Sequence, residues 1–321
     1  MPELLQISPD ARQVLIAANP HAGTGGRQGV VAELRRQLED QACEVSLVTN
    51  PGALADLAAE KLAAGTLRAV VAAGGDGTFN LVLNKTPPGT PLVILPLGTE
   101  NLLARHLGIA ADPRQLTRIV CGGHAVRLDA AQAGERLFTL MAGCGFDADV
   151  VRRLHQNRKG NIRHLSYAKP ILDSIRNYHY AELRVRYAPE GGSWGNAETI
   201  SARWVFVVNL PRYAGGLSFA PDASGADGLL DVCTFKSGSL WNALLYLGSV
   251  MLGQHEGMQD FVRVRTTRLQ IEADAPTPYQ LDGDPGGELP VEIRSLPGRL
   301  TLLVSRDWAE REGFAAPAEA D

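Results

Sequence analysis

Glycine, threonine and one aspartate are concentrated in the segment Gly74–Asn80, which has the sequence GGDGTFN. Glycines let a backbone approach phosphate groups closely, and Thr78 and Asn80 could donate hydrogen bonds to them. Asp76 would repel a bare phosphate, but a divalent cation such as Mg²⁺ between the two would make the contact favourable. The segment therefore indicates metal-assisted phosphoryl transfer; the alternative is a glycine-rich turn in which Asp76 caps the next helix.

Two further segments contain similar small residues. Asn19–Arg27 (NPHAGTGGR) lies between an apolar run and a helical pattern, so its N–H groups could face an anion at a helix N-terminus, where Arg27 adds a cation. It lacks the GKS or GKT of a Walker A loop and the GxGxxG spacing, and an ordinary turn fits it equally well. In Pro96–Asn101 (PLGTEN), Thr99 could cap a helix and face the same crevice.

A parallel sheet would bring these three segments to one edge. Short apolar runs predict strands at Val14–Asn19, Glu44–Thr49, Ala69–Gly75 and Pro91–Gly98, and helical patterns predict helices at Arg27–Asp40, Ala53–Ala64 and Asn101–Leu107. This alternation is typical of βαβ units, and ligands of such sheets bind beyond the carboxyl ends of the strands. Each of the three segments follows a predicted strand, so we expect them to lie close together.

The pattern changes near Val126. Alternating segments then predict a mostly β second domain, with single strands expected at Val262–Ala273, Val291–Ile293 and Leu300–Val304 among others. Two helices are expected in it, at Leu165–Asn177 and Leu240–Leu252. We therefore predict an α/β domain over 1–126, a β-rich domain over 127–305, and a short charged helix in the tail 306–321.

Composition excludes several classes of protein. The chain has 321 residues, of which 45% are hydrophobic, and a formal net charge of −4, which argues against disorder and against a dedicated nucleic-acid binder. The four cysteines form no CxxC pair, so the sequence predicts neither a disulfide framework nor a zinc site. The longest apolar run, Leu240–Gly253, is too short to span a bilayer, and no signal peptide is evident. We expect a soluble, cytoplasmic protein.

The ordered set of motifs resembles one family. NPHAG, GGDGTFN and PLGTEN are similar to the motifs of the diacylglycerol kinase catalytic domain superfamily, in its YegS-like bacterial lipid kinase branch, to which sphingosine kinases are related. In the second half, Gly143–Ala148 (GCGFDA), Asn209–Val232 and Tyr279–Asp284 (YQLDGD) resemble further motifs of the same family. The resemblance extends from about Val14 to Val304, so it covers nearly the whole chain.

The resemblance implies a fold and an activity. The expected architecture is a Rossmann-like three-layer α/β nucleotide domain followed by a sandwich-like β domain, with the active site in the inter-domain cleft and the tail folded back on the first domain from Trp308 onward. The expected activity is transfer of the γ-phosphoryl group of ATP to a lipid hydroxyl, with Mg²⁺ as cofactor. Diacylglycerol, giving phosphatidic acid, is the expected acceptor.

The resemblance also implies roles for individual residues. Together with the motif analysis, it predicts that ATP is bound by Asn19, Pro20, His21, Ala22, Gly23, Arg27, Thr49, Gly74, Gly75, Asp76, Gly77, Thr78, Phe79, Asn80 and Thr99. Asp227 is expected to bind a metal ion together with backbone oxygens of Ser224 and Leu229. Asp284 is expected to be the general base, and Asp282 to share that work or hold metal. The family usually has Glu where this chain has Asp284 and Leu81.

The acceptor and the partners stay open at this level. Alternatives are a sphingoid-base or other lipid kinase of the same fold, a kinase for a soluble nucleotide as in NAD kinases, and a non-catalytic protein that binds nucleotide or lipid. Arg152–Lys169 contains six Lys or Arg residues and no acidic residue, so it could dock on an anionic membrane at the inner membrane face, or be a solvated basic surface. The sequence leaves the oligomeric state undetermined, a dimer included.

Overall fold

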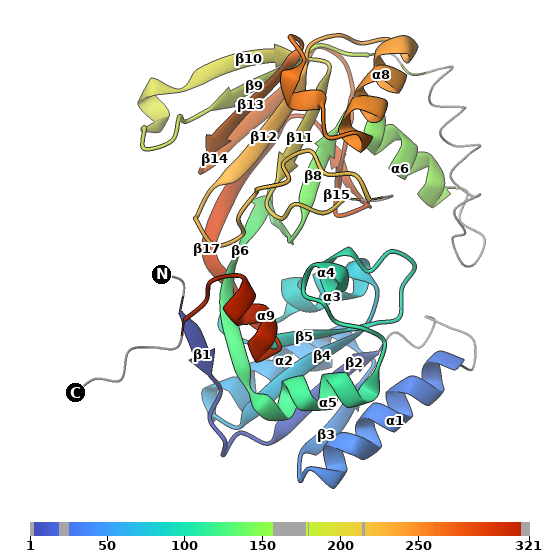
Figure 1. Cartoon of the computed structure of the whole chain (residues 1–321), viewed down its shortest axis with the longest axis vertical. Helices are drawn as coiled ribbons and strands as arrows, with labels where there is room; N and C mark the ends of the chain where they lie inside the picture. The colour runs from blue at the N-terminus through green and yellow to red at the C-terminus, as the bar shows by residue number, and fades with distance from the viewer. Residues whose placement is uncertain (1–2, 19–25, 157–177, 179, 214–215, 316–321) are drawn as a thin grey trace. The chain divides into compact units, whose positions relative to one another are not determined.

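The computed structural model describes residues 3–18, 26–156, 178, 180–213 and 216–315, without the side chains of residues 26, 27 and 240. The chain divides into two compact units. Unit 1 contains residues 1–129 and 298–321, and unit 2 contains residues 130–297. The sequence had placed the second boundary after residue 305, so unit 1 includes more of the last strand than expected. The predicted fold class, an α/β domain and a β-rich domain, is confirmed (Figure 1).

Unit 1 is built on a parallel sheet of apolar strands. The strands lie in the order β3-β2-β4-β5, and the end of β17 pairs with β5 in parallel. All residues of β4 and β5 are buried, because helices cover both faces of a sheet of this kind. The bounds are β2 Gln13–Ala18, α1 Gly26–Asp40, β3 Glu44–Val48, α2 Pro51–Ala63, β4 Leu67–Gly74, α3 Asp76–Lys85, β5 Pro91–Pro96 and β17 Val291–Leu303.

The remaining elements of unit 1 lie around this sheet. α5 (Pro113–Gly122), which the sequence analysis did not predict, begins at the side-chain cap of Asp112 and ends at Gly123 in the left-handed region, with φ +67°. α9 (Arg306–Arg311) is held by buried Trp308, whose Nε1 donates to the carbonyl of His106 at 2.9 Å. β1 Leu4–Gln6, α4 Leu102–His106 and the first part of β6 (His124–Ala133), which continues into unit 2, complete the unit, and β1 pairs with β6 antiparallel.

Unit 2 is a sandwich of two antiparallel sheets. One has the order β13-β12-β11-β8-β15-β16, and the other continues from β17 through β14 and β9 to β10. Alternate residues enclose the core between the sheets, such as Val205 and Val207 of one sheet and Leu269 and Ile271 of the other. The bounds are β7 Arg136–Phe138, β8 Met141–Cys144, β9 Leu183–Tyr187, β10 Glu198–Ala202, β11 Trp204–Val208, β12 Leu230–Phe235, β13 Phe261–Thr266, β14 Arg268–Ala273, β15 Pro278–Leu281 and β16 Asp284–Glu288.

A second apolar cluster covers the outer face of the six-stranded sheet. Trp204, Phe206 and Val208 of β11 point to this face, since side chains alternate along a strand. The helices α6 (Phe146–Gln156) and α8 (Leu240–Met251) pack on it and lie on the same side of the sheet (Figure 1). No helix in the part of the chain that the structure describes is long and apolar enough to cross a bilayer.

The second half of the chain divides into strands at other points than predicted. The segment Val262–Ala273 forms two strands, β13 and β14, because the chain turns at Thr267. Conversely, the two strands predicted at Val291–Ile293 and Leu300–Val304 are one continuous strand, β17. The helix predicted at Leu165–Asn177 lies outside the described residues.

Candidate functional site

The glycine segments that follow β4 and β5 are in direct backbone contact. A Cβ atom at position 98 would lie 2.5 Å from Cα of Gly75, and one at position 75 would lie 3.1 Å from Cα of Gly98. Leu97 N donates to the carbonyl of Gly74 at 2.9 Å, which ties the two turns together. These glycines are therefore required for the two strand ends to approach each other, whatever they bind.

Asp76 connects the same two segments through its side chain. Its Oδ2 accepts from Leu102 N at 3.0 Å and its Oδ1 accepts from Leu103 N at 3.1 Å. Asp76 therefore caps the N-terminus of α4, a role that the sequence analysis assigned to Thr99. Thr99 is exposed, and the residue before α4 is Asn101, in the left-handed region with φ +50°. The first turn of α4 thus has the carboxylate of the neighbouring turn as an acceptor, and the predicted role of Thr99 stays a prediction.

The helix α3 begins directly at the tip of β4. In the described structure Gly75 precedes it without a side-chain cap, and the carbonyl of Gly75 accepts from Thr78 N and Phe79 N. Thr78 is partly exposed, but the side chains of Phe79 and Asn80 are buried. The prediction that Phe79 binds ATP is wrong for its side chain, because that side chain is fully buried in unit 1.

The other predicted nucleotide residues are only partly described. Asn19, Pro20, His21, Ala22 and Gly23 lie outside the described residues, as does the side chain of Arg27. Gly77 is exposed in the first turn of α3. Thr49 is exposed directly after β3, next to Asn50, whose side chain caps α2 by accepting from Gly52 N and Ala53 N.

In unit 2, Asp282 is a structural anchor. Its carboxylate accepts four hydrogen bonds, from Thr139 N, Thr139 Oγ1, Leu140 N and Met141 N, at 2.7 to 2.9 Å. Asp282 also has a positive φ of +50°, which an aspartate tolerates at a tight turn. The carboxylate thus holds the turn between β15 and β16 against the start of β8, and this arrangement does not favour the predicted proton transfer or metal binding by Asp282.

Asp284, the predicted base, begins β16 and faces the end of α6. His155 Nε2 lies 3.4 Å from Asp284 Oδ1, and the two side chains are 27% and 35% exposed. A partly exposed carboxylate beside an imidazole is accessible to a substrate and can exchange a proton. His155 has no role in the predictions made from the sequence. No local signal links the two, because they are far apart in the chain and meet only through packing of α6 on β16.

A buried polar chain positions the turn that carries Asp284. Asp147, at the start of α6, accepts from Tyr213 Oη and, at 3.0 Å, from Gln280 Nε2. Gln280 Oε1 in turn accepts from Gly283 N at 2.7 Å. Burial raises the pKa of Asp147 above its usual range. A Cβ at position 143 would lie 2.2 Å from Asp147 Oδ2, which explains the first glycine of the GCGFDA motif.

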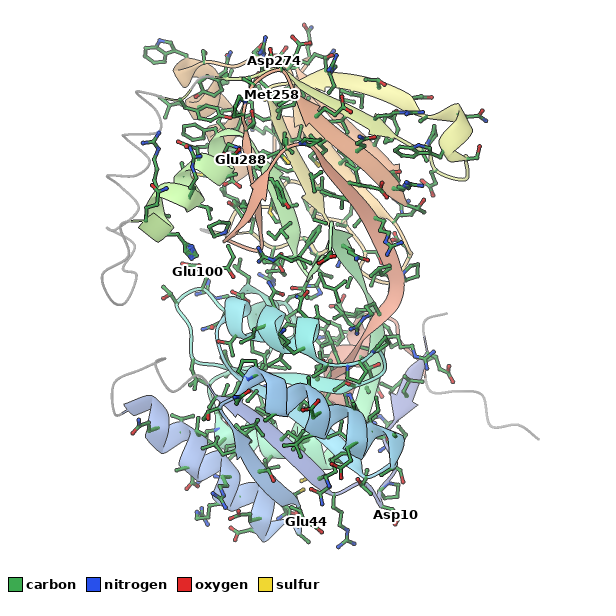
Figure 2. All side chains as sticks on the ribbon, turned by 180° about the vertical axis from the view of Figure 1, so that it is seen from behind. Asp10, Glu44, Glu100, Met258, Asp274 and Glu288 are labelled. Carbon is green, nitrogen blue, oxygen red and sulfur yellow. The ribbon has the colours of Figure 1, made fainter. Side chains whose placement is uncertain are left out.

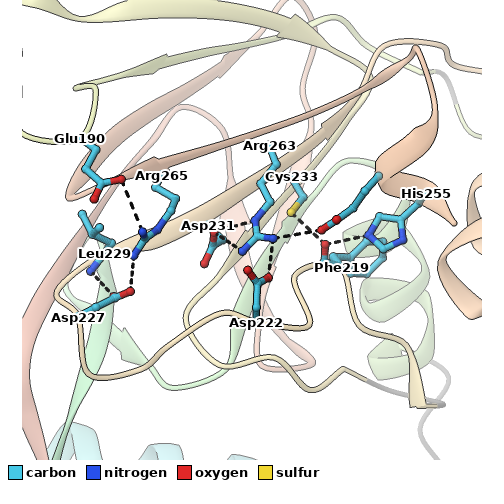
Figure 3. A network of polar contacts seen from close by, with 11 residues as sticks. Glu190, Phe219, Asp222, Asp227, Leu229, Asp231, Cys233, His255, Arg263 and Arg265 are labelled. Atoms are coloured by element: carbon cyan, nitrogen blue, oxygen red, sulfur yellow. Dashed lines mark hydrogen bonds and ion pairs between the residues drawn. The ribbon is translucent and has the colours of Figure 1, made fainter. Parts of the chain in front are cut away.

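The predicted metal residues form a different arrangement from the expected one. Asp227 Oδ1 accepts from Leu229 N at 3.0 Å, and Asp227 Oδ2 pairs with the guanidinium of Arg265 (Figure 3). Ser224 is exposed in the same loop. The guanidinium of Arg265 therefore occupies the position that a metal ion would take at the carboxylate of Asp227. Among the described residues no group of three or more His, Cys, Asp or Glu side chains could hold a metal ion.

The loop that carries Asp227 is fastened to β13. Arg263 contacts Asp231 at 2.8 Å and Asp222 at 2.6 Å, and Arg265 reaches Asp227 and Glu190 (Figure 3). The acidic residues of the Asn209–Val232 motif, Asp222, Asp227 and Asp231, are therefore all partners of these two arginines.

The basic segment Arg152–Lys169 is described only at its start. Arg152 and Arg153 both contact buried Asp149 at 2.6 Å, and Arg152 also lies 3.9 Å from Glu288, which Figure 2 labels. These two cations are therefore already paired within unit 2. Arg158, Lys159, Arg163 and Lys169 lie outside the described residues.

Comparison with known proteins shows that each half of the chain matches a family model. Residues 13–133 match the family model "Diacylglycerol kinase catalytic domain", and residues 141–304 match the model "YegS C-terminal NAD kinase beta sandwich-like domain". Together these models cover the strand ends of unit 1 and the sandwich of unit 2.

Whole-length relatives give the same result. The chain is 26% identical over 306 residues to a protein of Bacillus subtilis named diacylglycerol kinase, with 94% of this chain and 99% of that one aligned. It is 29% identical over 312 residues to one of the same name from Mycobacterium tuberculosis, with 92% and 96% aligned. A crystal structure of a diacylglycerol kinase from Bacillus anthracis has the same fold, with a TM-score of 0.68, 23% identity, and 92% and 98% covered.

Proposed function

This chain belongs to the YegS-like family of bacterial lipid kinases and is an ATP-dependent lipid kinase, and we propose that it phosphorylates diacylglycerol to phosphatidic acid. The observation that carries the proposal is the match of residues 13–133 to the diacylglycerol kinase catalytic domain. The same residues form the sheet whose strand ends bring Gly75 and Gly98 together.

Unit 1 supplies features that suit a triphosphate. The amino terminus of α3 carries a positive partial charge and begins at the carboxyl end of β4, where ligands of parallel sheets bind. Asp76 directs its charge to the amides of α4, so it caps that helix and not α3. We propose that the backbone of Gly75–Thr78 contacts the phosphates of ATP, and that Thr49 and Thr99, exposed after β3 and β5, also contact the nucleotide.

In unit 2, we propose that Asp284 removes the proton from the lipid hydroxyl. It is partly exposed and has His155 beside it, whereas Asp282 accepts four hydrogen bonds from the start of β8 and the residues before it. Phosphoryl transfer depends on positioning and charge neutralisation, so the precision with which Gln280 and Asp282 hold this turn matters. His155 is assigned as a positioning residue for the carboxylate of Asp284.

The described residues do not fit a metal site held by the protein. The carboxylate of Asp227 pairs with Arg265, and that of Asp76 accepts from two backbone amides. No step is therefore assigned to a metal ion bound by Asp227, and the proposed Mg²⁺ requirement concerns the ATP that is added to the reaction.

The proposal is tested by transfer of labelled γ-phosphate from ATP. The full chain is incubated with ATP, Mg²⁺ and mixed micelles that each contain one acceptor: diacylglycerol, a sphingoid base or another lipid alcohol, with NAD as a soluble acceptor. We expect label in phosphatidic acid. Label in a sphingoid phosphate or in NADP instead would show that the acceptor is a sphingoid base or NAD and not diacylglycerol. ATP binding without any transfer would contradict catalysis.

A matched pair of variants identifies the residue responsible. Asp284→Asn removes the proposed base with little change in shape, so turnover should fall about 100-fold or more while ATP affinity is unchanged. Asp10→Asn makes the same change at an exposed site of unit 1 and should keep the wild-type rate (Figure 2). If Asp284→Asn retains the wild-type rate, the assignment of the base is wrong.

A further inference from the structure

The helix α8 is apolar on both of its faces. Ala243, Tyr246 and Val250 are buried in the cluster on the outer face of the six-stranded sheet. On the opposite side, large apolar side chains are exposed to solvent: Trp241 by 79%, Leu244 by 52%, Leu245 by 57%, Met251 by 74% and Leu252, which follows the helix, by 71%. We call these five residues the α8 stripe.

The α8 stripe lies along one side of the helix, with Gly248 and Ser249 between its two ends. Trp241, Leu244, Leu245 and Leu252 are spaced i, i+3, i+4 and i+11, which places them on one side, and Met251 lies beside them. Residues 240–252 include no Asp, Glu, Lys, Arg or His. A surface helix normally has charged or polar residues on its outer face, whereas a helix that is apolar all round is covered by something.

The exposure is concentrated at this helix. Of the large hydrophobic side chains that are exposed in the described structure, only Leu47 and Leu81 lie elsewhere. Scattered exposed residues need no explanation, but a contiguous apolar patch marks an interaction site. The burial of Tyr246 and its hydrogen bond to Asp260 at 2.8 Å fix the orientation of the helix, so the stripe faces outward as part of the fold.

We propose that the α8 stripe inserts into the surface of the lipid bilayer that contains the substrate. This rests on the proposed function: diacylglycerol stays in a membrane, so the kinase must work at the bilayer surface. A short helix that presents Trp and Leu to solvent can bury these side chains in the interfacial region of a bilayer, where the ring of Trp241 is favoured.

A membrane fits the stripe better than a second copy of the chain does. α8 has 12 residues and is therefore about 18 Å long, so one face about 10 Å wide offers an area of a few hundred Å². A stable protein–protein interface buries about 800 Å² on each partner, with polar groups at its rim. The α8 stripe by itself lacks this area, whereas a bilayer requires only that apolar side chains enter it.

The test is sedimentation with vesicles, which does not depend on catalysis. Wild-type protein should bind vesicles of pure phosphatidylcholine, since the stripe carries no charge. Changing its most exposed members, as Trp241→Ser, Met251→Gln and Leu252→Ser together, should weaken binding about tenfold or more. The combined Leu47→Ser and Leu81→Ser variant changes the apolar residues exposed elsewhere and should bind as wild type does.

Several outcomes would overturn the proposal. They are wild-type protein that does not bind neutral vesicles, equal binding by the wild type and the α8 variant, and binding that requires anionic lipid, which would favour the basic segment Arg152–Lys169. A wild-type dimer that becomes monomeric in the variant would assign the stripe to a second copy. If the triple variant is unfolded by circular dichroism, Leu244→Ser with Leu245→Ser provides the same test.

An activity measurement separates this proposal from the proposed function. The α8 variant should lose about tenfold in rate on long-chain diacylglycerol in vesicles, yet keep the wild-type rate on a water-soluble short-chain diacylglycerol. Equal loss on both substrates would contradict a docking role. The wild type could phosphorylate neither substrate and still bind vesicles through the α8 stripe. That result would contradict diacylglycerol as the acceptor but support the α8 stripe as the membrane-binding surface.

Discussion

The turns at the strand ends of unit 1 and unit 2 keep their shape by different means. In unit 1 the turns after β4 and β5 combine direct contact between the backbones of Gly75 and Gly98 with the carboxylate of Asp76, which accepts from two amides of α4. In unit 2 the turn between β15 and β16 is held by a carboxylate, that of Asp282, which accepts four hydrogen bonds. The difference shows that a glycine or an aspartate within a motif can serve shape, and that Asp282 and Asp284 have separate roles.

The largest effect on stability is expected for Asp282→Ala. It leaves three buried backbone amides without their acceptor and places alanine at a positive φ, so unit 2 should lose about 3 kcal/mol or more of unfolding free energy. Urea unfolding measures this, and hydrogen exchange should accelerate in peptides from 139–144. Asp284→Ala is the control and should leave stability nearly unchanged; equal destabilisation by both would remove the distinction between the two aspartates.

Gly98→Ala tests the backbone contact in unit 1. Its Cβ would lie 2.5 Å from Cα of Gly75 and 2.6 Å from Asn101 Oδ1, so the two turns must separate, at about 2 to 3 kcal/mol. Gly29→Ala, in α1 with no heavy atom within 4 Å of the new methyl group, should be neutral or slightly stabilising. The comparison would fail if both variants unfolded at the same urea concentration.

A smaller effect is expected for Asp76→Asn. The amide side chain retains one oxygen for Leu102 N or Leu103 N but loses the other acceptor, which should cost about 1 kcal/mol. Hydrogen exchange of residues 102–106 should increase, because the first turn of α4 loses part of its cap. Unchanged exchange there would show that Asp76 does not cap α4 in solution; Asp10→Asn is the matched control.

His155 allows a test of positioning in unit 2. His155→Gln keeps a side-chain donor near Asp284, whereas His155→Ala does not, so turnover should stay near wild type in the first and fall about threefold in the second. The KM for ATP should not change in either. A merely structural role would instead lower the melting temperature of both variants without rescue by glutamine.

The smallest effect is expected for chemical labelling of the cysteines, whose thiol pKa values also differ between the two units. In unit 1, a hydrogen bond from Cys43 lowers the pKa of Cys121 to about 7, and the Arg68 guanidinium acts in the same direction. In unit 2, burial raises the pKa of Cys144 and Cys233. Iodoacetamide should therefore label Cys121 first, at a rate that rises with pH around 7 and then levels off as the thiolate becomes fully formed. Faster labelling of Cys144 or Cys233 would contradict this.

The sequence alone was sufficient for the parts of the fold that depend on local patterns. The apolar runs of β4 and β5 are buried on both faces, so hydrophobicity and glycine punctuation located them within two residues. The same reasoning overlooked α5, although Asp112, Pro113 and Gly123 carry the start and stop signals of a helix. The motif order also placed the chemistry-bearing segments at strand ends.

Sequence determined which residues gather at the strand ends, because strand and helix periods and glycine turns are local properties of the chain. Only the tertiary structure decided what their side chains do. Asp76 caps a helix 26 residues further on, Asp282 holds amides more than 140 residues earlier, and Asp284 faces His155 of the helix that packs against its strand. A hydrogen bond is satisfied by whichever donor folding brings within about 3 Å, and no local pattern records which one that is.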